Sequence, residues 1–226
     1  MILSLETSTP VCSIALHNEG KLLARQAYHS DKSHSVLLPS IIGEILDNAL
    51  VKKNDLQAVA ISAGPGSYTG LRIGLSTTKG LCFALGIPLI SVGTLDTLIA
   101  QAKNWTPSGA LICPMLDARR MEVYTKLVKA TGEQIWELQP LILEEDTFQE
   151  YSDKSLYLFG SGAAKCRDFL KHPNLIIVDD IHPDAAFTGK IAWEKFKSQE
   201  FEDLAYYEPN YLKEFQTKKA SNKLLS

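Results

Sequence analysis

Several features that would assign a chain to a broad class are missing from this sequence. Its four cysteines form no CxxC pair, and each stands among apolar or small residues: Cys12, Cys82, Cys113 and Cys166. This pattern is typical of reduced, buried thiols rather than of disulfides or a zinc site. No apolar run approaches about 18 residues, and neither end carries a targeting signal. We therefore expect a cytoplasmic protein with no membrane contact.

Positive charge and the common hydrolase motifs are missing too. The formal net charge of -3 provides no basic field, so tight binding of bare nucleic acid is not expected of the chain alone. No HExxH, GxSxG or paired Cys/His pattern occurs, which leaves protease and hydrolase chemistry without residues. His34 is followed at the next helical turn by Leu38, and His29 lies at a spacing that no helix face shares. We predict no metal site.

The order of patterns along the 226 residues predicts two lobes of related design. Residues 1–29 indicate a β-meander, which is followed by a helix over 35–51, a buried strand and a second helix over 69–84. A second meander begins near residue 109, after the loop-forming stretch "NWTPSG". We predict an α/β fold with lobes at 1–104 and 105–204, each a mixed sheet with flanking helices. Part of 205–226 is expected to fold back and complete the first lobe.

The stretch "ISAGPGSYTGLRIGLSTTKGL", residues 61–81, joins a strand to a helix through Gly64, Gly66 and Ser67. Backbone N–H groups at such a helix start attract anions. No Gly-Lys-Ser/Thr follows the glycines, and the next glycine is Gly70, so neither the Walker A nor the GxGxxG pattern is met. A tight turn and an anion site are equally compatible with the pattern. The stretch "SLYLFGSGAAKCRDFL", with Gly160 and Gly162, also predicts strand, glycine turn and helix and leaves the same choice.

The two N-terminal helices carry more apolar surface than one core requires. Apolar residues of the first cover roughly 220° of the helical wheel, where about 100° suffices for packing on one core. The surplus is buried either between two elements of the chain or against a second protein. We favour a partner surface, which also includes the small-residue face of the second helix. The predicted interface residues are Leu38, Ile41, Ile42, Ile45, Tyr68, Thr69, Leu71, Arg72, Gly74, Leu75 and Thr78.

Five stretches together resemble the TsaB family, formerly YeaZ: "LSLETST", "HSVLLPSI", "SAGPGSYTGLRIGLSTTKGL", "LDARRMEVY" and "EPNYLK". The resemblance implies a two-lobed, actin-like ATPase fold. It implies a non-catalytic partner of the TsaD catalyst, which a TsaE ATPase joins, in making N6-threonylcarbamoyladenosine at position 37 of tRNAs that read ANN codons. It also implies that the first two helices pair with those of the partner as a four-helix bundle, and that tRNA is contacted only through the complex.

The resemblance leaves some properties open. No intrinsic cofactor is expected. The resemblance is compatible with ATP or ADP bound at the joint with the catalyst, and also with a homodimer of the isolated chain. The family usually has glycine where this chain has Met121, which cannot take a positive φ cheaply, so the hairpin after Asp117 is expected to differ locally.

An enzymatic alternative is an ATP-dependent phosphotransferase or ATPase of the same fold. Glu6 and Asp117 would be its two catalytic acids, although an aspartate in a position such as that of Asp117 more often caps a turn. The residues that could contact a nucleotide or anion are Glu6, Thr7, Gly64, Gly66, Ser67, Gly160 and Gly162.

Overall fold

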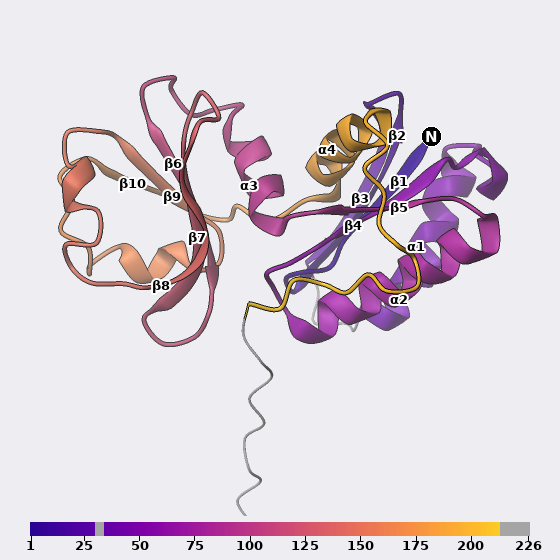
Figure 1. Cartoon of the computed structure of the whole chain (residues 1–226), viewed down its shortest axis with the longest axis horizontal. Helices are drawn as coiled ribbons and strands as arrows, with labels where there is room; N and C mark the ends of the chain where they lie inside the picture. Colours follow the sequence, from indigo (N-terminus) through magenta and orange to yellow (C-terminus); the bar gives the residue numbers. More distant parts are fainter. Residues whose placement is uncertain (30–33, 213–226) are drawn as a thin grey trace, which may run out of the picture.

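The computed structural model describes residues 1–29 and 34–212, and it has two lobes, each built on one five-stranded sheet (Figure 1). The strand order is β3-β2-β1-β4-β5 in the first sheet and β8-β7-β6-β9-β10 in the second, so the same topology occurs twice. In each, an antiparallel meander is followed by two parallel strands. The strands are β1 Ile2–Glu6, β2 Val11–Asn18, β3 Lys21–His29, β4 Ala58–Ser62, β5 Leu89–Val92, β6 Leu111–Asp117, β7 Glu122–Lys129, β8 Gln134–Ile142, β9 Leu156–Phe159 and β10 Leu175–Val178. The predicted α/β class with two mixed sheets is confirmed.

In the part of the chain that the structure describes, four α-helices and three short 3-10 helices accompany these sheets. The helix predicted after Gly162 is wrong in kind, because only a short 3-10 helix forms there. Pro173 follows closely, and the residue before a proline avoids helical backbone, so little chain is left for a longer helix. The helices are α1 His34–Asn48, α2 Tyr68–Leu85, α3 Thr94–Ala102, α4 Ala185–Lys197, η1 Lys53–Asp55, η2 Gln149–Tyr151 and η3 Ala163–Cys166.

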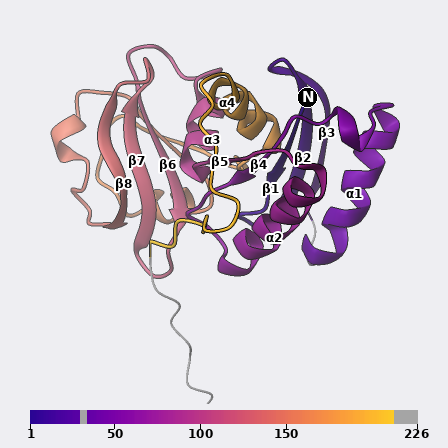
Figure 2. The same cartoon turned by 45° about the vertical axis from the view of Figure 1, so that its right-hand side comes forward.

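Helices cover the first sheet on both faces, as Figures 1 and 2 show. Leu3 and Leu5 of β1 face a core that α1 and α2 close. Ile2, one residue out of phase, faces α4 together with Ala58 and Ala60 of β4. A strand buried on both faces has no polar side, which explains why β1 and β4 read as almost continuous apolar runs.

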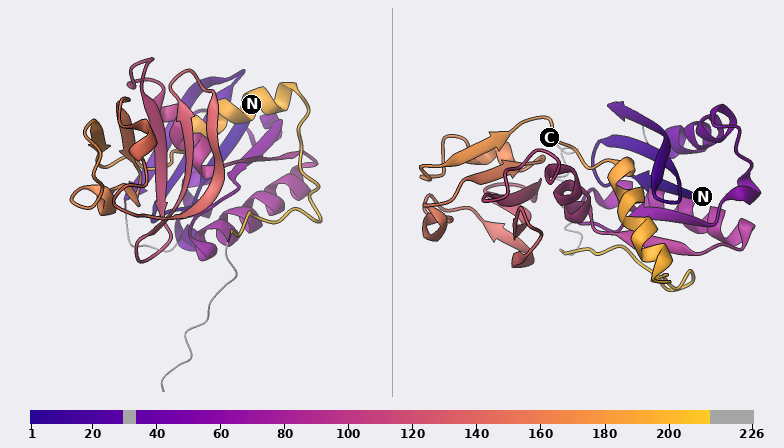
Figure 3. Two further views of the ribbon diagram at one scale, coloured as in Figure 1. Left: turned by 60° about the vertical axis from the view of Figure 1, so that its left-hand side comes forward. Right: turned by 90° about the horizontal axis from the view of Figure 1, so that it is seen from above.

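Two helices pack on the sheet of the other lobe. α3 precedes the second meander in sequence but contributes Leu95 and Leu98 to the core of the second sheet. α4 follows the second sheet yet packs on the first. Figure 3 shows the two helices side by side between the sheets, where the hydroxyls of Thr97 and Thr188 lie 3.2 Å apart. The strands therefore divide near residue 105, whereas the ranges 1–104 and 105–204 do not describe how these two helices pack.

Polar contacts hold α4 on the first sheet. Asp184 caps the helix by accepting the N–H of Ala186 at 2.9 Å, and it forms an ion pair with Arg25 of β3. The His17 ring contacts the carbonyl oxygen of Ala186 at 3.0 Å. Gly189 lies directly over the same ring, where any Cβ would overlap it. The contacts of Asp184, His17 and Gly189 therefore position α4 on the first sheet, in addition to the burial of its apolar residues.

The segment after α4 returns along the first lobe. Glu202 pairs with Leu89 at the free edge of β5, and Tyr207 packs against the core beneath α2. Asn210 donates its N–H to the carbonyl of Ala63 at 2.7 Å, and Lys79 of α2 reaches the carbonyl of Ala205 at 3.2 Å. Residues 205–212 thus pack along the first lobe, while 213–226 lie outside the described residues.

Two glycines of α2 have opposite environments, and substituting them tests the packing. A Cβ at Gly74 would overlap the Thr7 hydroxyl and lie 2.7 Å from Cδ1 of Ile61, whereas a Cβ at Gly80 meets nothing within 4 Å. We expect Gly74→Ala to lower the free energy of unfolding by about 1–3 kcal/mol through overpacking. Gly80→Ala should raise it by about 0.5–1 kcal/mol through helix propensity. Urea unfolding of both variants measures this, and equal effects would contradict the packing of α2.

Candidate functional site

The glycine turn before α2 packs directly on the turn between β1 and β2. A Cβ at Gly66 would overlap the carbonyl of Ser8, and one at Gly70 would overlap the carbonyl of Thr7. Ser67 donates its N–H to the Ser8 carbonyl at 2.6 Å, and its side-chain oxygen accepts the N–H of Gly70 at 3.2 Å. Two N–H groups expected to attract an anion therefore already have protein acceptors. Glycine is required at these two positions because the backbones of the two turns lie too close together for a Cβ.

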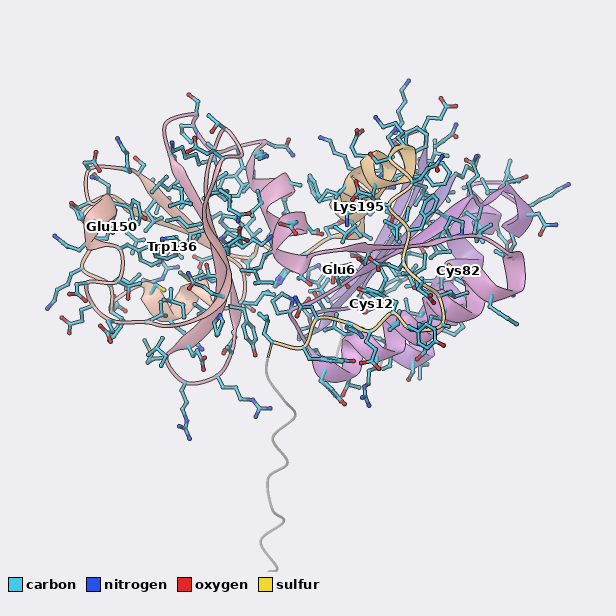
Figure 4. All side chains as sticks on the ribbon, viewed as in Figure 1. Glu6, Cys12, Cys82, Trp136, Glu150 and Lys195 are labelled. Atoms are coloured by element: carbon cyan, nitrogen blue, oxygen red, sulfur yellow. The ribbon has the colours of Figure 1, made fainter. Side chains whose placement is uncertain are left out.

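Glu6 ends the central strand β1 and is completely buried, on the side of the first lobe that faces the second (Figure 4). Its Oε1 accepts the N–H of Ser8 at 2.8 Å, while Oε2 has no hydrogen-bond partner among the described residues. Burial raises the pKa of this carboxyl, and hydrogen bonds from Ser8 and Ser62 oppose the rise only in part. Burial therefore disfavours the charged form of this carboxyl relative to that of an exposed glutamate.

Asp117 holds the equivalent position at the end of β6, in a different environment. Its side chain is 47% exposed, and Oδ1 accepts both the Lys165 ammonium and the N–H of Arg119 at 2.6 Å. The N–H of Asp117 points to the Ser161 hydroxyl at 3.1 Å. No hydrogen bond between described residues joins Asp117 to Glu6. The two predicted acids are thus one buried carboxyl and one exposed member of an ion pair.

The second glycine turn supports β6. A Cβ at Gly160 would lie 2.5 Å from the carbonyl of Met115, and Gly160 itself has a φ of 92°, which disfavours other residues. A Cβ at Gly162 would lie 2.8 Å from the side chain of Val123. In the described residues, no hydrogen bond joins this turn to the turn at Gly64 and Gly66. The predicted nucleotide contacts therefore divide into two clusters, one in each lobe.

Most of the predicted interface residues face the core of the chain itself. Their expected outward orientation is wrong, because α1 packs on β2 and β3 and also beside α2, and so uses its wide apolar arc internally. The small-residue face of α2 packs on β1 and β4 in the same way. The buried members are Leu38, Ile41, Ile42, Ile45, Leu71, Gly74, Leu75 and Thr78.

The outward sides of α1 and α2 carry residues that the helical wheel did not select. Phe83 is 83% exposed and Val36 is 70% exposed. Gly43 and Gly80 have open space where a Cβ would stand. Phe83 falls on the same side of the wheel as Arg72, so an aromatic ring on an otherwise polar face was the available signal.

Three predicted interface residues remain at or near the surface, at the start of α2. Thr69 and Arg72 are exposed, and Tyr68 is half-buried. The Arg72 guanidinium lies 4.2 Å from the centre of the Tyr68 ring, and its Nε is 3.4 Å from the hydroxyl of Tyr211. The rings of Tyr68 and Tyr211 lie 4.9 Å apart. This cluster attaches the returning C-terminal segment to α2.

The cysteines are free and buried. Burial raises the pKa of the Cys12 and Cys82 thiols to about 11, and those of Cys113 and Cys166 to about 12. They are therefore protonated thiols with little reactivity at neutral pH. Within residues 1–29 and 34–212, no three side chains of His, Cys, Asp or Glu are placed to hold a metal ion. No helix in the same ranges has the length and hydropathy to span a bilayer.

Comparison with known proteins identifies the family. The family model described as "TsaD: tRNA N6-adenosine threonylcarbamoyltransferase" matches residues 21–219. The tRNA threonylcarbamoyladenosine biosynthesis protein TsaB of Escherichia coli is 30% identical over 222 residues, which is 94% of each protein. The Bacillus subtilis protein of the same name is 37% identical over 126 residues, 56% of this chain and 54% of that protein.

A solved structure extends the likeness to three dimensions. A Pseudomonas aeruginosa protein, described as having similarity to peptidase YEAZ, superposes with a TM-score of 0.82 at 25% identity. The superposition covers 94% of this chain and 99% of that one. The chain therefore shares its two-lobed fold, with two sheets of the same strand order, with that protein. The chain belongs to the TsaB (YeaZ) family of tRNA threonylcarbamoyladenosine biosynthesis proteins.

Proposed function

We propose that this chain is the non-catalytic subunit that binds a TsaD-like catalyst and activates it for threonylcarbamoylation of adenosine 37 in tRNA. A TsaE-like ATPase joins the two proteins, and tRNA contacts the chain only through the complex. The name of the relative that aligns over 94% of both chains supports the pathway. The environment of Glu6 is the observation that carries the non-catalytic role.

A catalytic acid that holds hydrated Mg²⁺ must be ionised and accessible to water. Glu6 is completely buried, out of reach of a hydrated ion, and this burial raises the pKa of its carboxyl. Asp117 is accessible, but its charge is compensated by Lys165 at 2.6 Å. Neither carboxyl has the environment of a magnesium ligand. This supports an actin-like fold used for assembly rather than for phosphoryl transfer.

The outward sides of α1 and α2 are the surface on which we place the catalyst. Both helices cover the same face of the first sheet (Figures 1 and 2), so their exposed sides point away from it together. Phe83 and Val36 supply exposed apolar area there, and Gly43 and Gly80 permit close approach of a second helix pair. A specific complex through such a surface needs a total buried area of about 1,200–2,000 Å².

Three further properties follow from this assignment. The complex works in the cytoplasm, where tRNA is modified. ATP or ADP binds at the joint with the catalyst rather than within this chain. In the absence of the catalyst, the same exposed helix sides allow two copies of the chain to pair.

An ATPase remains the second candidate, because Glu6 and Asp117 end the central strands of the two sheets at equivalent positions. Purified protein separates the two functions. Mg²⁺-dependent ATP turnover that disappears in Glu6→Gln or Asp117→Asn would establish the ATPase and overturn the non-catalytic role.

Deleting the gene for this chain should abolish or strongly reduce threonylcarbamoyladenosine in cellular tRNA, because the catalyst loses its activating partner. Mass spectrometry of tRNA nucleosides measures the modification, and re-expression of the chain should restore it. Normal modification in a deletion strain without a second paralogue would refute the proposed function.

Phe83→Asp should weaken binding to the catalyst by about 2–4 kcal/mol, the range of an interface hot spot, with little effect on folding. The matched control is Ile142→Asp, since Ile142 is 68% exposed on β8 of the second lobe. Titration calorimetry and thermal melts measure binding and folding separately. Equal affinities for the two variants would place the interface elsewhere.

The contribution of Glu6 to the free energy of unfolding should fall as pH rises above 4.5, the ordinary pKa of a glutamate. Because the folded state raises the pKa of Glu6, it binds this proton more tightly than the unfolded state does. The loss should reach at most about 1.4 kcal/mol per pH unit, up to the folded-state pKa. Glu6→Gln should remove this slope, whereas Glu137→Gln, at an exposed position on β8, should retain it. Identical pH profiles for wild type and Glu6→Gln, measured by urea unfolding, would show that folding does not raise the pKa of Glu6.

A further inference from the structure

The turn between β6 and β7 holds two consecutive arginines in left-handed backbone. Arg119 has a φ of 73° and Arg120 a φ of 49°, while Met121, in place of the family's glycine, is not among the residues with positive φ. Left-handed backbone is unfavourable for residues with a Cβ, and long side chains are uncommon there. Such backbone strain concentrates at binding sites, which gives a reason to ask what these two side chains do.

The turn is held by groups other than the two guanidinium groups. Asp117 accepts the N–H of Arg119 at 2.6 Å, and the Lys165 ammonium joins Asp117 to the carbonyl of Glu122 at 3.1 Å. Ala118 donates its N–H to the same carbonyl at 3.1 Å. These contacts fix the backbone while leaving the arginine side chains out of the structural network.

Both arginine side chains are exposed, and neither makes a hydrogen bond or ion pair with a described residue. The carboxylates that flank the turn are already engaged, since Asp117 pairs with Lys165 and Glu122 also has an interaction partner. Around the turn there are therefore three cationic side chains, the two arginines and Lys165, and only two carboxylates, both of which already have partners. A guanidinium held on a rigid turn loses little freedom on binding and offers a planar pair of donors to oxyanions.

We infer that Arg119 and Arg120 bind phosphate oxygens of the RNA backbone when the complex holds its substrate. The inference rests on the proposed function, which supplies a polyanionic substrate. A chain with a net charge of -3 repels RNA as a whole, so a contact requires a local cationic point such as this turn. Figure 1 shows the β6–β7 turn at the end of the second lobe that points the same way as the turn between β1 and β2. RNA bound at this end would meet the second lobe through the two arginines.

The test uses the complex with the catalyst, an unmodified tRNA transcript as probe, and binding measured over a range of salt concentrations. The variant is Arg119→Asn/Arg120→Asn, because asparagine tolerates left-handed backbone and so removes charge without removing the turn. The control is Lys52→Gln/Lys53→Gln, which removes two exposed charges near α1. We expect the slope of log K against log salt to become shallower by about 1.5 in the arginine variant, at about 0.7–0.9 per lost phosphate contact. The lysine variant should keep the wild-type slope.

A third variant, Arg119→Lys/Arg120→Lys, keeps the charge and loses the planar donor pair, so it should retain most of the salt slope with weaker binding. An unchanged slope in the asparagine variant, at an unchanged melting temperature, would overturn the inference. Loss of ATP binding with an unchanged RNA slope would overturn it by assigning the turn to a nucleotide phosphate. Failure of this variant to assemble with the catalyst would overturn it by assigning the turn to a protein contact.

If wild-type complex modifies the transcript and the asparagine variant binds it with the wild-type slope, the inference alone fails. If the wild-type chain has no effect on modification of the transcript, the proposed function fails, and the inference that rests on it fails as well.

Discussion

The close approach of α2 to the turn after β1 is the constraint on which the first lobe depends. Gly70 and Gly74 are four residues apart and therefore lie on one side of α2, and Gly66 lies in the turn just before the helix. Each faces Thr7 or Ser8 where a Cβ would overlap. This contact sets the position of α2, and α2 in turn supports α1 and the returning C-terminal segment.

The two lobes share a topology but not a chemistry. Glu6 and Asp117 end corresponding strands, yet one is withdrawn from solvent and the other is neutralised at the surface. The helical cover differs as well, because the position taken by the long α2 in the first lobe is taken by the short η3 in the second. The first lobe thereby carries two long helices with outward sides, and the second carries an exposed hairpin turn instead. The two lobes therefore share a strand order but present different groups at their surfaces.

Much of the fold was predictable from the sequence, because alternation and glycine turns report local backbone states directly. The β-meanders, α1, α2 and the two-sheet division follow from such patterns. Which side of each helix faces the solvent was not predictable. A helical wheel shows how much apolar surface a helix has, but not how many other elements of the chain pack against that surface. Ile45 is buried by the sheet and α2 together, and Phe83 is exposed although aromatic. The packing of α3 and α4 was also inaccessible, because nothing in a local pattern shows which of two sheets a helix will cover.

The crossing of α4 to the first lobe has a consequence for synthesis on the ribosome. One face of the first sheet, including Ile2, Ala60 and Ile90, is covered by a helix that ends only at Lys197. During translation the strands that form this apolar face are synthesised early, whereas α4, which packs on them, is synthesised only near the end of the chain. The N-terminal half alone therefore lacks the helix that covers this face, and the first sheet is covered on both sides only after residue 197 has been synthesised.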